Sequence, residues 1–355
     1  MGLETSLLLG LTLVSIGGFV DSSVGVFLKY PRRWKWEHLW LTYNLLGFGV
    51  FPWVVGFVAV SNLTGILGAA ELLDVGRIFL FGLGWGLGAV LFGLSVKYAG
   101  VALSYAIVMG LTSAIGALVP LVLWHSEDVF TLRGGIVIGA VLVLVLGVIL
   151  CSWAGHFKEI AWSAADNRGS SPIGQRPMLG VALAILSGIF SPMSALGFNY
   201  GGETIELLAK NMGTPALWAS VPVAVILLNA GAAVNVAYCG VLISRAGTWN
   251  LMQRPSTDHV LGLCMALIAP VGLTLFPMGS SQMGDLGKIV GWPIMASVGI
   301  LGANSLGALT GEWKGAGKRP VILMMVAAAI LSAAMFALGG LDEFVPFVRR
   351  FLGAS

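Results

Sequence analysis

The sequence predicts an all-α membrane protein whose ten transmembrane helices form two inverted five-helix repeats. The first reason is composition: 57% of the 355 residues are hydrophobic and 10% are charged, whereas soluble domains carry about 25% charged residues. The second is a series of apolar runs long enough to cross a bilayer. The third is a polar stretch near the middle that divides these runs into two sets of five. With an odd number of spans in each half, the two halves enter the membrane from opposite sides, as inverted repeats do.

Apolar runs of about 20 residues, the length of a helix that crosses the hydrocarbon core, give the predicted spans. Short loops that carry charged residues, glycine or proline separate them. The eighth span contains Pro270 and Pro277, a residue type that interrupts helices. In chain order the predicted spans are 7–28, 38–60, 76–97, 101–124, 134–155, 179–199, 215–240, 258–278, 288–310 and 320–340.

The polar stretch 156–178 predicts a cytoplasmic linker between the two repeats. The N-terminal five-helix repeat then covers residues 1–155, and the C-terminal five-helix repeat covers residues 179–355. A weak internal match supports this division, because residues 17–23 (GGFVDSS) can be laid over residues 188–194 (GIFSPMS). Each stretch lies in the first span of its predicted half.

Basic residues give the predicted orientation. Most of the 19 Lys and Arg residues fall in the odd-numbered loops, and loops rich in these residues stay in the cytoplasm. Arg349 and Arg350 near the C-terminal end are exceptions. We therefore expect a multi-pass protein of the cell inner membrane with both termini in the periplasm.

Asp21 lies further from a span end than the other acidic residues do. Lys29 follows it at the end of the first span, and the helical rise places Asp21 roughly 12 Å inside that end. A charge at such depth costs a few kcal/mol and normally faces a cavity, a partner or a proton pathway. We predict that Asp21 carries a coupled proton. The alternative is a carboxylate in a hydrated cytoplasmic vestibule that pairs with Lys29 or a nearby arginine.

Four serines are candidates for contacting a polar substrate. Ser22 and Ser23 lie in the first span, and Ser191 and Ser194 flank Pro192 in the sixth. Proline frees a backbone carbonyl in a membrane helix, and broken helices near the midplane form binding sites in transporters built from repeats. The alternative is that each serine hydroxyl bonds to a carbonyl of its own helix.

Amides and one indole complete the predicted substrate site. An amide donates and accepts hydrogen bonds at once, which suits hydroxyl-rich ligands, although asparagine also commonly joins helices in membranes. Trp85 lies well inside its span, where a ring can stack on a ligand. Trp34, Trp36, His125 and His259 lie near span ends, where anchoring at the membrane interface is the expected role. The amide candidates are Asn44, Asn199, Asn235 and Asn304.

Other kinds of chemistry find little support. The chain has no glycine-rich phosphate loop, no His-Glu-x-x-His, no Gly-x-Ser-x-Gly and no paired intramembrane acids. Its three cysteines fall inside apolar runs without the spacing of a metal site or a disulfide framework. We expect no enzyme activity, no cofactor and no metal. No solvated basic patch suggests nucleic acid.

Several stretches resemble the L-rhamnose–proton symporter family of the drug/metabolite transporter superfamily. They occur in the family's order and cover nearly the whole chain. The resemblance implies ten helices in two inverted five-helix repeats and uptake of a sugar coupled to protons. The stretches are KYPRRWKWE at 29–37, FLFG at 79–82 followed by WGLG at 85–88, GIFS at 188–191 with Asn199 after it, Asn235 with Cys239, and GEWKGAGKRP at 311–320.

These features together predict a secondary active transporter. It would import a neutral sugar, L-rhamnose or a related monosaccharide, by proton symport with alternating access. The expected partners are the sugar, the proton and the lipid bilayer, with sodium left open as the coupling ion. Two alternatives stay open: a metabolite or drug exporter of the same superfamily, and a membrane sensor that does not transport.

Overall fold

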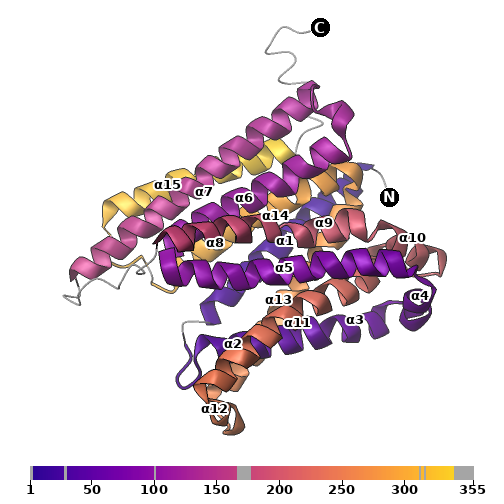
Figure 1. The fold of residues 1–355 in the computed structure, drawn as a ribbon. Coiled ribbons are helices and arrows are strands. Elements are labelled where there is room, and N and C mark those ends of the chain that lie inside the picture. The colour runs from indigo at the N-terminus through magenta and orange to yellow at the C-terminus, as the bar shows by residue number, and fades with distance from the viewer. Residues whose placement is uncertain are drawn as a thin grey trace. The chain divides into compact units, whose positions relative to one another are not determined.

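The computed structural model describes residues 3–27, 30–99, 101–165, 177–311, 313–315 and 317–339, and within these ranges the regular structure is entirely helical (Figure 1). The elements are α1 (Leu3–Phe27), α2 (Trp36–Thr42), η1 (Tyr43–Val50), α3 (Phe51–Ala59), α4 (Leu63–Ala69), α5 (Leu72–Ala99), α6 (Val101–Leu123), η2 (Ser126–Asp128), α7 (Leu132–Ala165), α8 (Pro177–Phe190), α9 (Met193–Leu196), η3 (Gly197–Gly201), α10 (Glu203–Asn211), η4 (Ala216–Trp218), α11 (Val221–Ala246), α12 (Asn250–Gln253), α13 (Thr257–Gln282), α14 (Gly284–Leu309) and α15 (Lys318–Gly339).

Within the described residues, 8 helical stretches are long and apolar enough to cross a membrane. The prediction of an all-α membrane protein is therefore confirmed. Two further predicted spans, the fourth and the tenth, correspond to the helices α6 and α15 but are not among these stretches, so the full count of ten stays a prediction. The stretches are Ser6–Phe27, Trp36–Ala59, Leu72–Ala99, Leu132–Lys158, Met178–Gly201, Ala216–Ala246, Thr257–Gln282 and Gly284–Leu309.

Three details of the spans differ from simple straight helices. The second predicted span is interrupted by the π-helical η1, and the sixth by a turn at Ser191–Pro192 and the π-helical η3. π-Helical turns are rare and are found frequently at functional sites. The eighth span is continuous through its two prolines as α13, and the Thr274 hydroxyl donates to the Pro270 carbonyl at 2.7 Å. Such side-chain bonds and neighbouring helices make proline tolerable in a membrane helix.

The helices gather into two compact units, each of which takes segments from both halves of the sequence. The first unit comprises residues 1–90 and 190–284, and the second comprises residues 91–189 and 285–355. Part of the predicted linker is helical, because α7 continues through Ala165; residues 166–176 lie outside the described residues.

Within the first unit, α1 packs along α13, while α2, η1 and α3 pack against α11. Glycines at 10 and 17 of α1 meet glycines at 279 and 272 of α13, so the two helices run antiparallel with close backbones. Within the second unit, α7 packs along α15, and the two lie side by side in Figure 1. Small residues allow such approach where lipid gives no hydrophobic drive for helix association.

Candidate functional site

Asp21 lies at the contact between α1 and α13. A methyl group at Gly272 would lie 2.9 Å from the Asp21 Cβ and 2.7 Å from the Gly17 carbonyl oxygen, so no side chain separates α13 from this part of α1. Asp21 is half-buried, and Tyr43 of η1 is buried in a segment that also packs against α13. Asp21 thus lies where α1 meets α13 in the first unit. Its predicted alternative partner, Lys29, lies outside the described residues.

Three of the four candidate serines bond within their own segments. The hydroxyls of Ser22, Ser23 and Ser194 each donate to the carbonyl three residues earlier, which is the alternative that the sequence left open. Their oxygens can still accept hydrogen bonds. The bonds are Ser22 to Phe19 and Ser23 to Val20, both at 2.7 Å, and Ser194 to Ser191 at 3.4 Å.

Asn235 joins three helices of the first unit. Its side-chain oxygen accepts from the Trp40 indole at 2.9 Å, and its nitrogen donates to the carbonyls of Gly86 at 3.2 Å and Gly231 at 3.0 Å. Its exposed fraction is 1%. These bonds use both amide donors, so in this arrangement Asn235 holds α2, α5 and α11 together.

Two further amides bond to the second span. Asn44, buried in η1, donates to the Trp40 carbonyl at 2.9 Å. Asn229 of α11 donates to the Phe48 carbonyl and accepts from the Trp53 indole, both at 3.2 Å. The π-helical segment thus receives a side-chain donor from a neighbouring helix, as irregular backbone in a membrane requires.

A row of aromatic rings runs through the same unit. The ring centroids of Trp40 and Tyr43 lie 5.0 Å apart, those of Tyr43 and Phe48 5.0 Å apart, and those of Phe48 and Trp85 5.2 Å apart. The Trp85 ring lies against Gly231, where a side chain would overlap it. The row connects Trp40 of α2 with Trp85, the indole that the sequence singled out for stacking.

The remaining candidates fall in different units. Asn199 in η3 accepts from the Ser280 hydroxyl of α13 at 3.0 Å, within the first unit. Asn304 belongs to the second unit, where it donates to the Ile300 carbonyl at 2.8 Å. It lines a small pocket of about 240 Å³ between α14 and α15, together with Trp313. Every other candidate lies in the first unit.

Sequence reasoning missed Asp258, which is fully buried at the start of α13. Its carboxylate accepts three backbone N–H groups, those of Arg32 and Arg33 at 2.8 Å and that of Trp34 at 3.0 Å. The carboxylate therefore fixes the loop between the first and second spans to the start of the eighth. In the sequence, Asp258 lies at the end of a predicted span, where an acidic residue is expected simply as part of a helix start.

Neighbouring side chains strengthen this connection. The Trp34 indole donates to the Leu251 carbonyl at 3.1 Å, and the His38 Nε2 lies 3.2 Å from the Thr248 backbone carbonyl oxygen. The rings of Trp34 and His259 meet edge to face at 4.5 Å. Trp34 was expected to anchor the chain at the membrane interface. This prediction was wrong, because only 4% of Trp34 is exposed. The loop that carries Trp34 folds over the residues before α13.

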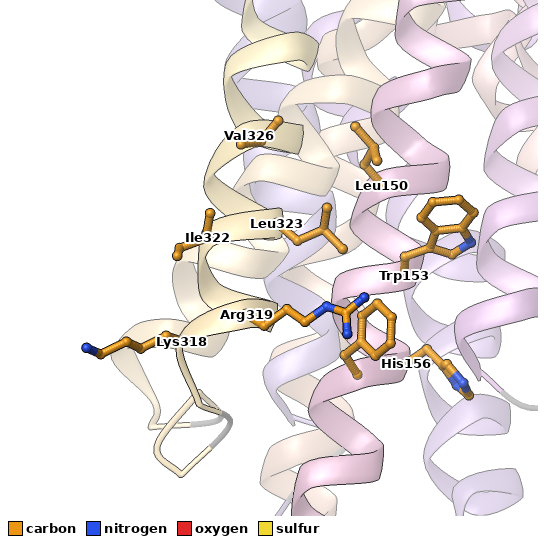
Figure 2. A pocket seen from close by; sticks show the side chains of 9 residues that line it. Leu150, Trp153, His156, Lys318, Arg319, Ile322, Leu323 and Val326 are labelled. Carbon is orange, nitrogen blue, oxygen red and sulfur yellow. The ribbon is translucent and has the colours of Figure 1, made fainter.

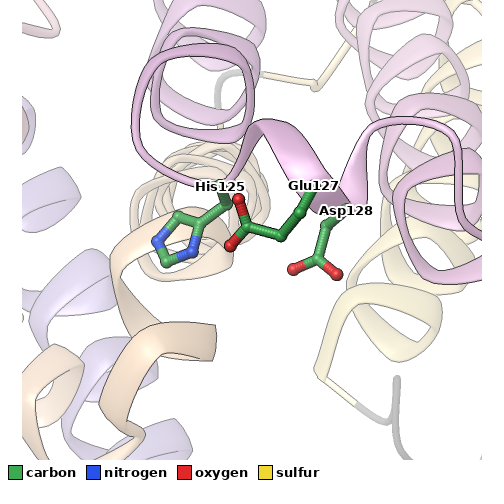
Figure 3. Close-up of side chains that lie close together, drawn as sticks. All are labelled: His125, Glu127 and Asp128. Atoms are coloured by element: carbon green, nitrogen blue, oxygen red, sulfur yellow. The ribbon is translucent and has the colours of Figure 1, made fainter.

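A separate polar group lies on the turn between α6 and α7. His125, Glu127 and Asp128 bring one ligand atom each to within 4.8 Å of one another (Figure 3). Glu127 is exposed, and three donors from one short turn leave most of a coordination shell to solvent. These three residues belong to the second unit.

Comparison with known proteins relates the chain to one family. The family model described as L-rhamnose-proton symport protein matches residues 3–341. The L-rhamnose-proton symporter of Yersinia pestis bv. Antiqua is 24% identical over 345 residues, which cover 95% of this chain and 98% of that protein. The L-rhamnose-proton symporter of Shigella dysenteriae serotype 1 is 23% identical, with 88% of this chain and 91% of that protein covered.

Proposed function

The chain belongs to the L-rhamnose–proton symport protein family, and from this premise we propose that it imports L-rhamnose or a related neutral monosaccharide together with protons. The match over residues 3–341 is the observation that carries the proposal. The chain is a transporter and not an enzyme. Export of a metabolite or drug, and sensing without transport, are not favoured by the relatives, which are named as symporters.

We further propose ten spans in two inverted repeats, covering residues 1–155 and 179–355 with 156–178 as the linker. Such repeats exchange the first span with the sixth and the third with the eighth. The first and eighth spans pack as α1 and α13, with Gly17 against Gly272. The third and sixth pack in the same antiparallel manner, with Gly84 against Met193 and Gly88 against Ser191. One pair of helices is therefore the repeat-related copy of the other.

The other helix pairs support the same symmetry. The second and seventh spans pack together, as do the fifth and tenth, and each of these pairs is exchanged with itself by the proposed repeat. The two compact units follow the same rule. The first contains the first, second, seventh and eighth spans with part of the third and part of the sixth, and the second contains the fourth, fifth, ninth and tenth spans with the remainder of the third and sixth.

We propose Asp21 as the proton carrier. Protonation removes a charge that is expensive inside a membrane, and the Asp21 backbone is packed tightly against α13. Asp258 at the start of α13 also binds the loop that follows α1. The helix α1, this loop and α13 would therefore move as one body. A proton on Asp21 can then bias that body between two positions, which alternating access requires.

The sugar would bind beside Asp21 in the first unit. Ser22, Ser23, Ser191, Ser194 and Asn199 offer hydroxyl and amide groups, and the aromatic row ending at Trp85 offers ring surface, a mixture usual in small-molecule sites. We assign Asn44 and Asn235 to positioning these groups, because their amides are already bonded. Asn304 belongs to the second unit and is not assigned to this site.

The decisive experiment measures uptake of labelled L-rhamnose into proteoliposomes under an imposed inward proton gradient. The variants are wild type, Asp21→Asn, and Asp285→Asn as the control, because Asp285 is an exposed acid at the start of α14. We expect gradient-driven uptake by wild type and the control. Asp21→Asn should lose that uptake and retain exchange of labelled for unlabelled sugar.

Each other outcome has a defined meaning. Uptake in Asp21→Asn that still follows the proton gradient would move the coupling site elsewhere. Accumulation driven by sodium in place of protons would replace the coupling ion. No uptake or exchange of any monosaccharide in wild type would contradict the transport function itself.

We propose that the protein lies in the inner membrane with both termini in the periplasm and the odd-numbered loops in the cytoplasm. In a background lacking Cys151, Cys239 and Cys264, we would test Ser126→Cys and Gln253→Cys, both at exposed positions. A membrane-impermeant maleimide added to intact cells should label position 126 directly and position 253 only after permeabilisation. The reverse pattern would invert the topology.

A further inference from the structure

A groove runs along the second unit between α7 and α15 (Figure 2). Its volume is about 860 Å³. Apolar side chains from both helices line most of its length, among them Leu150 and Trp153 of α7 and Ile322 and Val326 of α15. Trp153 and Ile322 are more than half exposed, at 57% and 59%, so the groove is open along its side.

One end of the groove is basic. His156 lies there on α7, and Lys318 and Arg319 lie there at the start of α15. The Arg319 guanidinium reaches toward α7 and lies 4.3 Å from the centroid of the Phe157 ring, while the Lys318 side chain points away from it (Figure 2). Among the side chains that the structure describes, no carboxylate pairs with Lys318 or Arg319.

The position of the basic end along the helices matches the edge of a membrane. The candidate span of α7 ends at Lys158, and α15 begins at Lys318. From Lys318 to Val326 the helix rises roughly 12 Å, so the apolar part of the groove lies at the depth of lipid chains and the basic end at the depth of their headgroups. Basic side chains between helices at that level bind anionic headgroups.

We propose that this groove is a binding site for an anionic phospholipid. An acyl chain lies along the apolar floor, and the phosphate contacts Arg319, with Lys318 adding positive charge and His156 a polar ring near the headgroup. A zwitterionic lipid fits the same floor but lacks the net negative charge that the basic end complements. This site involves none of the residues assigned to the proton or the sugar.

Native mass spectrometry of the full-length protein, offered phosphatidylglycerol or phosphatidylethanolamine with identical chains, tests the assignment. Wild type should retain phosphatidylglycerol preferentially. Arg319→Gln should weaken its retention by about fivefold, the factor that corresponds to about 1 kcal/mol per basic residue at an anionic surface. The control Arg245→Gln changes an exposed basic residue at the end of α11 and should leave the preference unchanged.

A second variant tests the chain-binding floor. Val326 is 45% exposed, so Val326→Trp can fold and fill the groove, and it should lower retention of both lipids. Equal retention of the two lipids by wild type, or unchanged selectivity in Arg319→Gln, would overturn the proposal. So would a dimer mass that disappears in Val326→Trp, because a second copy of the chain would then be the occupant.

Discussion

Gly272 lies so close to Asp21 that a methyl group added to it would be 2.9 Å from the Asp21 Cβ. Gly17, one turn earlier on α1, presents its carbonyl oxygen to the same point at 2.7 Å. Two backbones and one acidic residue thus share a space that has no room for another carbon atom. Any change in the separation of α1 and α13 changes the surroundings of the proposed proton carrier.

Gly272→Ala should therefore impair transport. Its methyl group meets backbone atoms and cannot be accommodated by a side-chain rotation, so the helices must separate, at a cost of about 1–3 kcal/mol. We expect sugar uptake in proteoliposomes to fall on the order of tenfold, as about 1.4 kcal/mol in a barrier gives. Gly25→Ala on α1 is the matched control, because nothing lies within 4 Å of its added methyl group. Equal uptake by the two variants would refute the tight contact.

Gly88→Ala should behave like Gly272→Ala if the repeats are related as proposed. A methyl group at Gly88 would lie 2.9 Å from the Ser191 backbone nitrogen and 3.0 Å from its hydroxyl oxygen. The cost should again be about 1–3 kcal/mol, measured as a lower midpoint of thermal unfolding together with reduced uptake. Gly93→Ala on the same helix meets no atom within 4 Å and is the control. If Gly88→Ala changed neither the unfolding midpoint nor uptake, the two helix pairs would not be equivalent as proposed.

The helical spans were predictable because a membrane leaves the backbone few choices. Polar backbone groups in lipid must bond within the segment, so a long apolar run becomes a helix. Even the two prolines of the eighth span, Pro270 and Pro277, lie within one continuous helix, α13. The π-helical η1 was not predicted, since its backbone depends on donors such as Asn229, which arrives from a helix distant in sequence.

The site was predictable in its residue types and only partly in their roles. A carboxylate at Asp21 stands out in an apolar run, and the structure places it against Gly272 of α13. The partners of Asp258 are backbone N–H groups more than 220 residues earlier, as in the 226-residue separation from Arg32. Since every residue except proline carries such a group, no sequence pattern could have revealed this contact.

Asn235→Leu distinguishes a positioning role from contact with the sugar. Removing the amide leaves the Trp40 indole unpaired, and such interhelical bonds contribute about 0.6 kcal/mol on average and about 1.7 at most. A double-mutant cycle with Trp40→Phe should give a coupling energy in this range from unfolding measurements. Once equal amounts of folded protein are compared, the KM for the sugar should stay within about threefold of wild type. The reason is that residues without a shared contact change each other's free energies by only about 0.5 kcal/mol. A large rise in KM with no coupling energy would make Asn235 a substrate contact instead.

Asp258→Asn should loosen the loop between the first two spans. The substitution keeps the size of the side chain but removes its charge and replaces one acceptor oxygen by a donor. That donor faces either the Arg32 N–H or the N–H groups of Arg33 and Trp34. Hydrogen bonds to charged groups contribute about 1.5–3 kcal/mol, so the open loop should become at least about tenfold more populated. Trypsin cleavage after these exposed arginines reports that population when opening is fast. We expect the cleavage rate, followed by mass spectrometry of the fragments, to rise by the same factor. The control is Asp285→Asn. The Asp285 carboxylate is exposed and lies 3.7 Å from the Lys288 Nζ, far in sequence from the loop, so its substitution should leave the rate unchanged. An equal rate in Asp258→Asn and wild type would show that the carboxylate does not hold the loop.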